Sequence, residues 1–216
     1  MHLHTAASFD CLADPLAVLA AARARDIDRI CITDHNEISA AVVLRDRFPD
    51  RVIVGEEVKT AEGVDIIGLF LTERIPRGTP ARETCERIHA QGGLVYVPHP
   101  FATGKGGGGR ILSQIADRID IVEALNARLH DRALNARAAA WARARGLPVG
   151  AGSDAHTVRE VASAWVELPR FELTPPAFLA SLQHASVHGT ASSRLVHVAS
   201  AYAKLRKKLG PSRVRV

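Results

Sequence analysis

The amino-acid sequence predicts an α/β protein in which short buried strands alternate with helices. Two observations support this prediction. Short, nearly continuous apolar runs such as 30–33 and 94–97 are typical of strands that are buried on both faces. Helical segments separate most of these runs, and such alternation favours a parallel sheet covered by helices.

The strands are expected at 30–33, 52–54 leading into 55–58, 65–70, 94–97, 120–125, 147–151 and 163–168. The helices are expected at 15–25, 38–47, 80–91, 130–145 and 176–184. Pro15 suits a first helical turn because its φ is already fixed near the helical value. Gly146 follows the fourth helix as a typical C-terminal stop. An eight-unit β/α barrel takes ~250 residues, so this 216-residue chain predicts a single domain with a shorter, distorted barrel.

The positive charge of the chain is concentrated at its C-terminal end. The formal net charge is +5, yet six basic residues and no acid lie from Lys204 onwards. Without them the chain has 22 basic against 23 acidic residues. We therefore expect a domain over 1–200 and a basic tail over 201–216, and the high net charge does not argue for a nucleic-acid groove on the body. The tail is typical of a solvated helix end, and a contact with RNA, a membrane surface or a partner is the alternative. Its removal from 204 should spare hydrolysis of a small substrate.

The cysteine pattern and the hydropathy indicate a cytoplasmic protein without a membrane span. Cys11, Cys31 and Cys85 are widely spaced and form no C-x-x-C pair, so neither a disulfide framework nor a zinc ribbon is expected. The sequence has no signal peptide and no apolar run near 18 residues.

Histidines and acids stand where most of the predicted strands end. They are His2 and His4, Asp34-His35, Glu57, His99, and Asp154 with His156. Residues two apart on a strand share a face, so His2 and His4 can bind one ion together. Imidazole and carboxylate ligands without thiolate suit Zn, Mn or Fe. The set exceeds the needs of one ion, and Glu57 is the best candidate to bridge two ions about 3.5–4 Å apart.

Five motifs in this order resemble those of the polymerase and histidinol phosphatase (PHP) superfamily, in particular its short stand-alone members. They are Met1-His-Leu-His-Thr-Ala-Ala-Ser-Phe-Asp10, Ile32-Thr-Asp-His-Asn36, Gly55-Glu-Glu57, Val97-Pro-His-Pro100 and Gly152-Ser-Asp-Ala-His156. The resemblance covers residues 2–157. It implies a distorted (βα)7 TIM-like barrel, two or three divalent ions and phosphoesterase chemistry.

The resemblance also implies a role for each matching position. His2, His4, Glu57 and Asp154 would bind the first ion; Glu57 and His99 the second; Asp10, His35 and His156 the third. Glu57, His99 and Asp154 form the implied catalytic set, with Glu56 as the alternative to Glu57. Asp65 stands where nucleotide-cleaving relatives have a histidine, and its carboxylate can still coordinate. Relatives have several residues before the H-x-H pair, including an aspartate, so we expect the natural start to lie upstream of Met1.

Substrate binding needs cations beside the metal ions. Arg128, which follows Asn126-Ala127 at a strand end, is the leading candidate because arginine binds phosphate oxygens bidentately. Arg110 and Lys105 are further candidates. Strand alternation is expected to place Glu123 and Asn126 on opposite faces, which favours Asn126 as the site residue.

A histidine and a glycine-rich segment are also expected near the predicted site. His130 is a candidate neighbour of the second ion. The glycine-rich segment 104–109 lacks the G-K-[S/T] ending of a P-loop and is expected to be a loop on the catalytic face, where it could act as a lid or a substrate contact.

The sequence therefore predicts a metal-dependent phosphoric ester hydrolase. Its substrate would be a nucleotide, the 5′ end of an oligonucleotide, or a small phosphorylated metabolite. Histidinol phosphate is the less favoured metabolite, because enzymes acting on it are generally longer. The alternative is a catalytically silent metal-binding module with a regulatory or structural role. Retention of the ligand residues argues against that alternative.

Overall fold

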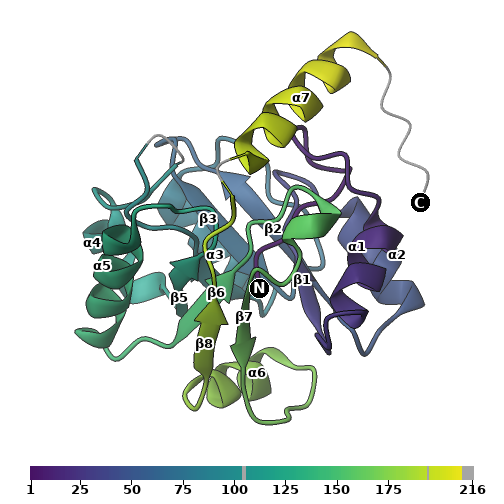
Figure 1. Cartoon of the computed structure of the whole chain (residues 1–216). Helices are drawn as coiled ribbons and strands as arrows, with labels where there is room; N and C mark the ends of the chain where they lie inside the picture. The colour runs from purple at the N-terminus through teal and green to yellow at the C-terminus, as the bar shows by residue number, and fades with distance from the viewer. Residues whose placement is uncertain (104–105, 194, 211–216) are drawn as a thin grey trace.

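The computed structural model describes residues 1–103, 106–193 and 195–210. Its main element is a curled six-stranded sheet in the order β1 to β6 (Figure 1). The strands are β1 Ile30–Ile32, β2 Val52–Lys59, β3 Asp65–Leu69, β4 Leu94–Val97, β5 Ile121–Asn126 and β6 Val149–Gly152. These bounds confirm the strands predicted in the same segments.

The sheet is mixed, so the prediction of a parallel sheet is wrong in part. β1 with β2, β4 with β5, and β5 with β6 pair in parallel, whereas β3 runs antiparallel to both β2 and β4. Only residues 60–64 join β2 to β3. A parallel crossover needs a dozen or more residues, so this short connection returns the chain as a hairpin.

Helices cover the sheet. They are α1 Pro15–Arg23, α2 Ser39–Arg47, α3 Ala81–Ala90, α4 Leu112–Ile115, α5 Arg132–Arg143, α6 Pro175–Leu182 and α7 Val196–Leu209, with 3-10 turns at Ala116–Arg118 and Val158–Glu160. Of these, α1, α2, α3, α5 and α6 confirm the five that the sequence predicted. Asp14 and Asp131 begin α1 and α5 by accepting backbone N–H groups of the first turn. None of the helices in the described part of the chain is long and apolar enough to cross a lipid bilayer.

The short helix α4, the strand β8 and the helix α7 were not predicted as such. β8 Ser186–Gly189 pairs antiparallel with β7 Ala164–Glu167 in a separate two-stranded sheet. β8 is half-exposed and has no continuous apolar run, so its sequence gives no strong strand signal. α7 is a 14-residue helix that crosses the predicted domain boundary at 200/201.

The first residues of the chain lie between the two edges of the six-stranded sheet. Three backbone hydrogen bonds hold them there, from Met1 N to Ala151 O, from Asp154 N to His2 O and from Thr33 N to Leu3 O, each 2.9 Å long. The strand ladders thus form a curled half-barrel, and the N-terminal segment spans its open side. This arrangement places His2 and His4 next to the carboxyl ends of β1 and β6.

Two buried clusters fill the space on either side of the sheet. One lies between the sheet and helices α1 to α5 and includes Val18, Leu44 and Ile88. The other lies against α6 and includes Tyr96, Ile121 and Phe178. Cys11, Cys31 and Cys85 are free and buried.

Glu56 is a fully buried acid that points away from the predicted metal site. Its Oε2 accepts a hydrogen bond from the backbone N of Ile75 at 2.8 Å, and burial raises its pKa to about 7 from the ordinary value of 4.5. In the unfolded chain the group ionises near its ordinary value. Ionised Glu56 is therefore disfavoured in the folded state, and stability falls as the pH rises from about 4.5 through 7.

We expect Glu56→Gln to be more stable than the unchanged chain at pH 8 by about 1–2 kcal/mol, because the amide oxygen keeps the bond to Ile75 without a buried charge. Near pH 5 the difference should be smaller. Urea unfolding of both proteins at the two pH values measures it. A difference that does not change with pH would contradict the assignment of the charge penalty to Glu56.

Candidate metal centre

The histidines and acids predicted as ligands meet in one cleft at the carboxyl ends of the strands. The cleft has a volume of about 540 Å³. Its lining includes Asp10, His35, Glu57, Asp65, His99, Asp154 and His156 from the predicted set. Most of these side chains are buried, and charged groups are rarely buried unless they are paired.

The innermost group consists of His2, His4, Glu57 and Asp154. Nε2 of His2 lies 3.1 Å from Nε2 of His4 and 3.3 Å from Oε2 of Glu57. Nε2 of His4 lies 3.4 Å from both Oε2 of Glu57 and Oδ1 of Asp154. Ligand atoms bound to one ion at about 2.0–2.2 Å stand roughly 3–3.6 Å apart. His2, His4 and Asp154 can therefore each offer one atom to a single ion, and His2, Glu57 and His99 form a second such group.

Glu57 joins this group to the remaining predicted ligands. Its Oε1 lies 3.2 Å from Nε2 of His99, and its Oε2 lies 3.0 Å from Nδ1 of His35. Asp10 extends the cluster, with Oδ2 3.6 Å from Nε2 of His35 and Oδ1 3.4 Å from Nε2 of His156. Against the effect of its burial, these two imidazoles hold the pKa of Asp10 well below its ordinary value. Eight of the nine predicted ligands are thus brought together.

The local fold explains why these side chains converge. Alternation along β2 turns Glu57 into the cleft and its neighbour Glu56 towards Ile75. His99 and Asp154 have positive backbone φ values of 28° and 50°. Such conformations cost of order 1–3 kcal/mol for residues other than glycine and cluster at functional sites.

Asp65, the ninth predicted ligand, lies at the edge of the cluster. Its Oδ1 is 2.5 Å from Nζ of Lys59, and its backbone N donates to Gly106 O at 2.8 Å. Burial and the nearby charge of Glu57 raise the pKa of Asp65 to about 6. The carboxylate has a cationic partner in the structure, and its role as a metal ligand stays a prediction.

The carboxylates and imidazoles of the cluster control one another's protonation. Burial, together with the neighbouring rings of His156 and His35, lowers the pKa of His4 to about 3, so this imidazole is neutral at pH 7 and able to coordinate. Burial opposes ionisation of Glu57, yet the imidazoles of His35 and His2 hold its pKa well below the ordinary value. Against the effect of their burial, Glu57 in turn raises the pKa of His2, His35 and His99, that of His35 to about 9. Metals bind neutral imidazoles, so an ion at these three rings would displace protons.

Glu123 supports the cluster from behind. Its Oε1 lies 3.1 Å from Nδ1 of His2 and accepts from the Tyr96 hydroxyl at 3.0 Å. Its Oε2 accepts from His99 N at 2.7 Å and from Nδ2 of Asn126 at 2.9 Å. A carboxylate bound to the second nitrogen of a ligating histidine fixes the orientation of that ring.

The expectation that Glu123 and Asn126 lie on opposite faces is therefore wrong. The register of β5 against β6 shifts between Glu123 and Leu125, which is a β-bulge. One extra residue in a bulge reverses the alternation beyond it. The available sequence signal was a carboxylate inside an apolar strand, since a buried acid needs partners.

Asp34 orders the loop that follows the H-x-H pair. It accepts hydrogen bonds from Thr5 N, Thr5 Oγ1 and Ser8 Oγ, each 2.6 Å long. Ser8 Oγ is also 3.1 Å from Nδ1 of His4. Asp34 thus supports His4 through Ser8, much as Glu123 supports His2 directly.

Arg128 lies at the cleft, but its guanidinium is already occupied by protein groups. Nη1 is 2.7 Å from Nδ1 of His156, and Nε is 3.1 Å from Oε1 of Glu160. Nη2 donates to Val196 O at 2.9 Å and to Ser200 Oγ at 2.8 Å. Arg128 is 4% exposed. It therefore joins α7 to the site, and its predicted contact with phosphate remains untested.

We expect Arg128→Met to lower the free energy of unfolding by about 3 kcal/mol, because Glu160 would be left as a buried unpaired charge. Arg110→Met is the matched control. Arg110 is exposed and donates to Glu62 O at 2.8 Å, so its loss should change stability by no more than about 0.5 kcal/mol. Urea unfolding measures both variants, and equal stability of the two would contradict the supporting role of Arg128.

The remaining candidates are placed as follows. Arg110 is not among the residues that line the cleft, and Lys105 lies outside the described residues. His130 contacts His197 of α7, with 3.2 Å between their Nε2 atoms. Gly106 lines the cleft, so this part of the glycine-rich loop lies on the ligand-bearing face. Sequence reasoning missed three cations that line the cleft, Lys59, Arg77 and Lys204.

The basic C-terminal helix forms one wall of the cleft. His197, Ser200, Ala201 and Lys204 of α7 line it. Nζ of Lys204 is 3.7 Å from Oδ2 of Asp10, and Nζ of Lys207 donates to Ala6 O at 2.6 Å and to Ser8 O. Because of these contacts, residues 204 and 207 are not a solvated helix end. Removal of 204–216 is therefore expected to lower hydrolysis of a small substrate, contrary to the expectation from the sequence.

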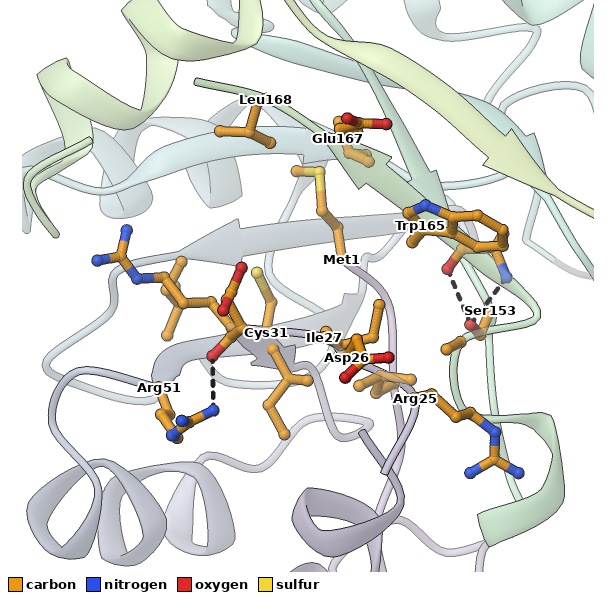
Figure 2. A pocket seen from close by; sticks show the side chains of 18 of the residues that line it. Met1, Arg25, Asp26, Ile27, Cys31, Arg51, Ser153, Trp165, Glu167 and Leu168 are labelled. Carbon is orange, nitrogen blue, oxygen red and sulfur yellow. Dashed lines mark hydrogen bonds between the residues drawn. The ribbon is translucent and has the colours of Figure 1, made fainter. Parts of the chain in front are cut away.

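A larger cavity of about 980 Å³ lies elsewhere, at the amino ends of β1 and β2. Figure 2 shows Met1, Cys31, Trp165 and Leu168 around it. Its lining contains no histidine. The smaller cleft therefore holds the groups suited to chemistry.

Fold and site together define a mixed α/β protein with a buried cluster of metal-binding residue types at its strand ends. A family model described as PHP-associated matches residues 132–187. An uncharacterized protein of Methanocaldococcus jannaschii is 39% identical over 134 residues, which cover 58% of this chain and 74% of that protein. Residues 132–187 thus match a PHP-associated family model, and the ordered motifs over 2–157 resemble the same superfamily.

Solved structures share the fold at low sequence identity. PsfC from Pseudomonas syringae PB-5123 has a TM-score of 0.69 at 21% identity, covering 97% of each chain. A two-domain Bacteroides vulgatus protein that contains a predicted PHP-like metal-dependent phosphoesterase has a TM-score of 0.69 at 16% identity, covering 88% of this chain and 63% of that one. A lesion-specific endonuclease from Pyrococcus furiosus has a TM-score of 0.61 at 12% identity, covering 87% and 56%.

Proposed function

We propose that this chain is a metal-dependent phosphoesterase with a multinuclear site. One observation carries the proposal: the carboxylate of Glu57 lies within 3.4 Å of a ring nitrogen of each of His2, His4, His35 and His99. A carboxylate placed among four imidazoles is suited to bridging ions. The match to a PHP-associated family model and the ordered set of predicted ligand residues support the same function.

Two or three divalent ions, of Mn, Zn or Fe, would be held by the residues of the cluster. His2, His4, Glu57 and Asp154 would hold the first, Glu57 and His99 the second, and Asp10, His35 and His156 the third. Such ions lower the pKa of water and neutralise charge on phosphate oxygens. We also propose that the N-terminal segment acts as a seventh strand. Together with β1 to β6 it would form the distorted seven-unit barrel expected from the sequence.

The protein's own groups would position the substrate. Lys59, Arg77 and Lys204 line the cleft and can contact phosphate oxygens beside the metal ligands. Glu57, His99 and Asp154 would form the catalytic set, while Asn126 is held by Glu123 at the back of the site. These contacts suit a phosphorylated small molecule, a nucleotide or the 5′ end of a short nucleic acid. The cytoplasmic location expected from the sequence stays a prediction.

A substrate panel tests the proposal. The purified chain is loaded with Mn or Zn and assayed on mono- and bis-p-nitrophenyl phosphate, nucleoside bisphosphates, short RNAs and sugar phosphates. We expect metal-dependent release of p-nitrophenol or phosphate and a preference within the panel. Stoichiometric metal binding without cleavage of any ester would instead support the silent regulatory or structural module.

A further inference from the structure

α7 and the residue that precedes it, Leu195, carry a stripe of large apolar side chains on the surface. Leu195, Val198, Tyr202, Leu205 and Leu209 are 76%, 65%, 59%, 55% and 77% exposed. Their spacing of three and four residues, repeated, is the a/d pattern of a coiled coil. We call these five residues the α7 seam. Soluble proteins rarely expose such a set without a partner.

The seam points away from the body of the protein. Ser200 and Ala203 of α7 are buried against the body, and Val196 and Lys207 are anchored there by Arg128 and by Ala6 O. At about 100° per residue, this inner face lies roughly 150° from the centre of the seam. Figure 1 shows α7 at the edge of the molecule, with its C-terminal half extending from the body. A second helix can therefore reach the seam.

We propose that the α7 seam pairs with the same seam of a second copy, in antiparallel orientation about a two-fold axis. Residues 195–203 contain no Lys, Arg, Asp or Glu, whereas Lys204, Arg206, Lys207 and Lys208 follow within five positions. In an antiparallel pair, Leu195 would lie opposite Leu205 and Val198 opposite Tyr202. The uncharged halves of the two helices would then pair with each other, and the basic residues of the two copies would lie at opposite ends of the pair. A parallel pair would align like charges.

The width of the seam and the position of the lysines favour a helix over a lipid surface. A strict a/d stripe is narrower than the apolar face of a helix that lies on a membrane. Lys204 and Lys207 contact Asp10 and the backbone of residues 6 and 8, so two of the four cations of α7 are directed at the body. α7 spans only two heptads, but its contacts with the rest of the protein already hold it as a helix. The free energy of pairing is therefore not reduced by the entropy of forming the helix. The pairing is independent of the proposed enzymatic activity.

Sedimentation velocity of the full chain tests the pairing. We expect a species of twice the 23.2 kDa chain mass and a monomer for Tyr202→Glu. Lys208→Glu introduces the same side chain on α7 outside the seam and should remain dimeric. Circular dichroism of each variant checks that it is folded. A monomeric unchanged chain, or a Tyr202→Glu variant that stays dimeric, would overturn the proposal.

Engineered cysteines test the orientation. The native cysteines are buried, so they give little background. Val198→Cys combined with Tyr202→Cys should form a covalent dimer on mild oxidation, whereas Tyr202→Cys alone should not. Efficient cross-linking of the single variant would overturn the antiparallel register. Co-sedimentation of a monomeric chain with vesicles of phosphatidylglycerol and phosphatidylcholine would assign the seam to a lipid surface instead of a second copy.

Discussion

Glu57→Gln is expected to lower phosphoester hydrolysis by more than the roughly 10–100-fold that loss of an outer partner of a metal site causes. The side chain contacts four imidazoles, and its ionised carboxylate is the shared charge of the cluster. Glutamine keeps the shape of the side chain but replaces two oxygens that share a negative charge with one neutral oxygen and an amide nitrogen. Activity should fall together with the metal content of the purified protein, measured by inductively coupled plasma mass spectrometry.

The neighbouring residue provides the matched control. Glu56→Gln makes the same chemical change one position earlier on β2, where the side chain bonds Ile75 N on the other face of the strand. Its turnover and metal content should stay near those of the unchanged chain. Circular dichroism checks that both variants fold. If Glu57→Gln kept full activity, or if Glu56→Gln lost as much, the site would not be built around Glu57.

The sequence predicted that these side chains lie close together, because strand ends constrain their positions. Short apolar runs ended at His35 and His99, and the carboxyl ends of neighbouring strands meet at one edge of a sheet. The choice of Glu57 over Glu56 followed from motif spacing, and alternation along β2 places Glu57 in the cleft. Whether these residues bind metal is a separate prediction that the geometry supports.

Other features depend on contacts that single-chain patterns do not encode. The β-bulge in β5 reverses the face to which the side chain of Asn126 points. A short apolar run gives no sequence signal for such a bulge. The direction of β3 depends on the length of the connection from β2, which is clear only once the strand ends are known. The basic residues near 204 look solvated in sequence, yet Lys204 and Lys207 contact residues about 200 positions away.

Glu123→Ala is expected to weaken metal binding and turnover by about 10–100-fold, although Glu123 is not placed to hold an ion itself. It is a positioning residue, because it binds Nδ1 of His2 and the backbone N of His99. Without it, His2 can rotate and His99 loses the contact that holds its positive-φ backbone. Metal affinity, measured by competition with a chelator, should therefore fall along with kcat.

Tyr96→Phe separates this role from a general loss of packing. The hydroxyl of Tyr96 donates to the same Oε1 of Glu123 at 3.0 Å, so its removal deletes one hydrogen bond and keeps the buried ring. We expect a small loss of stability, about 1 kcal/mol, and metal affinity near that of the unchanged chain. If both variants lost stability but kept metal affinity, Glu123 would serve only the core. A selective loss of metal affinity in Glu123→Ala would instead show that Glu123 orients the side chains that bind the metal. The physical reason is that a histidine ring bound to a metal through one nitrogen is held in orientation by the hydrogen bond to its other nitrogen.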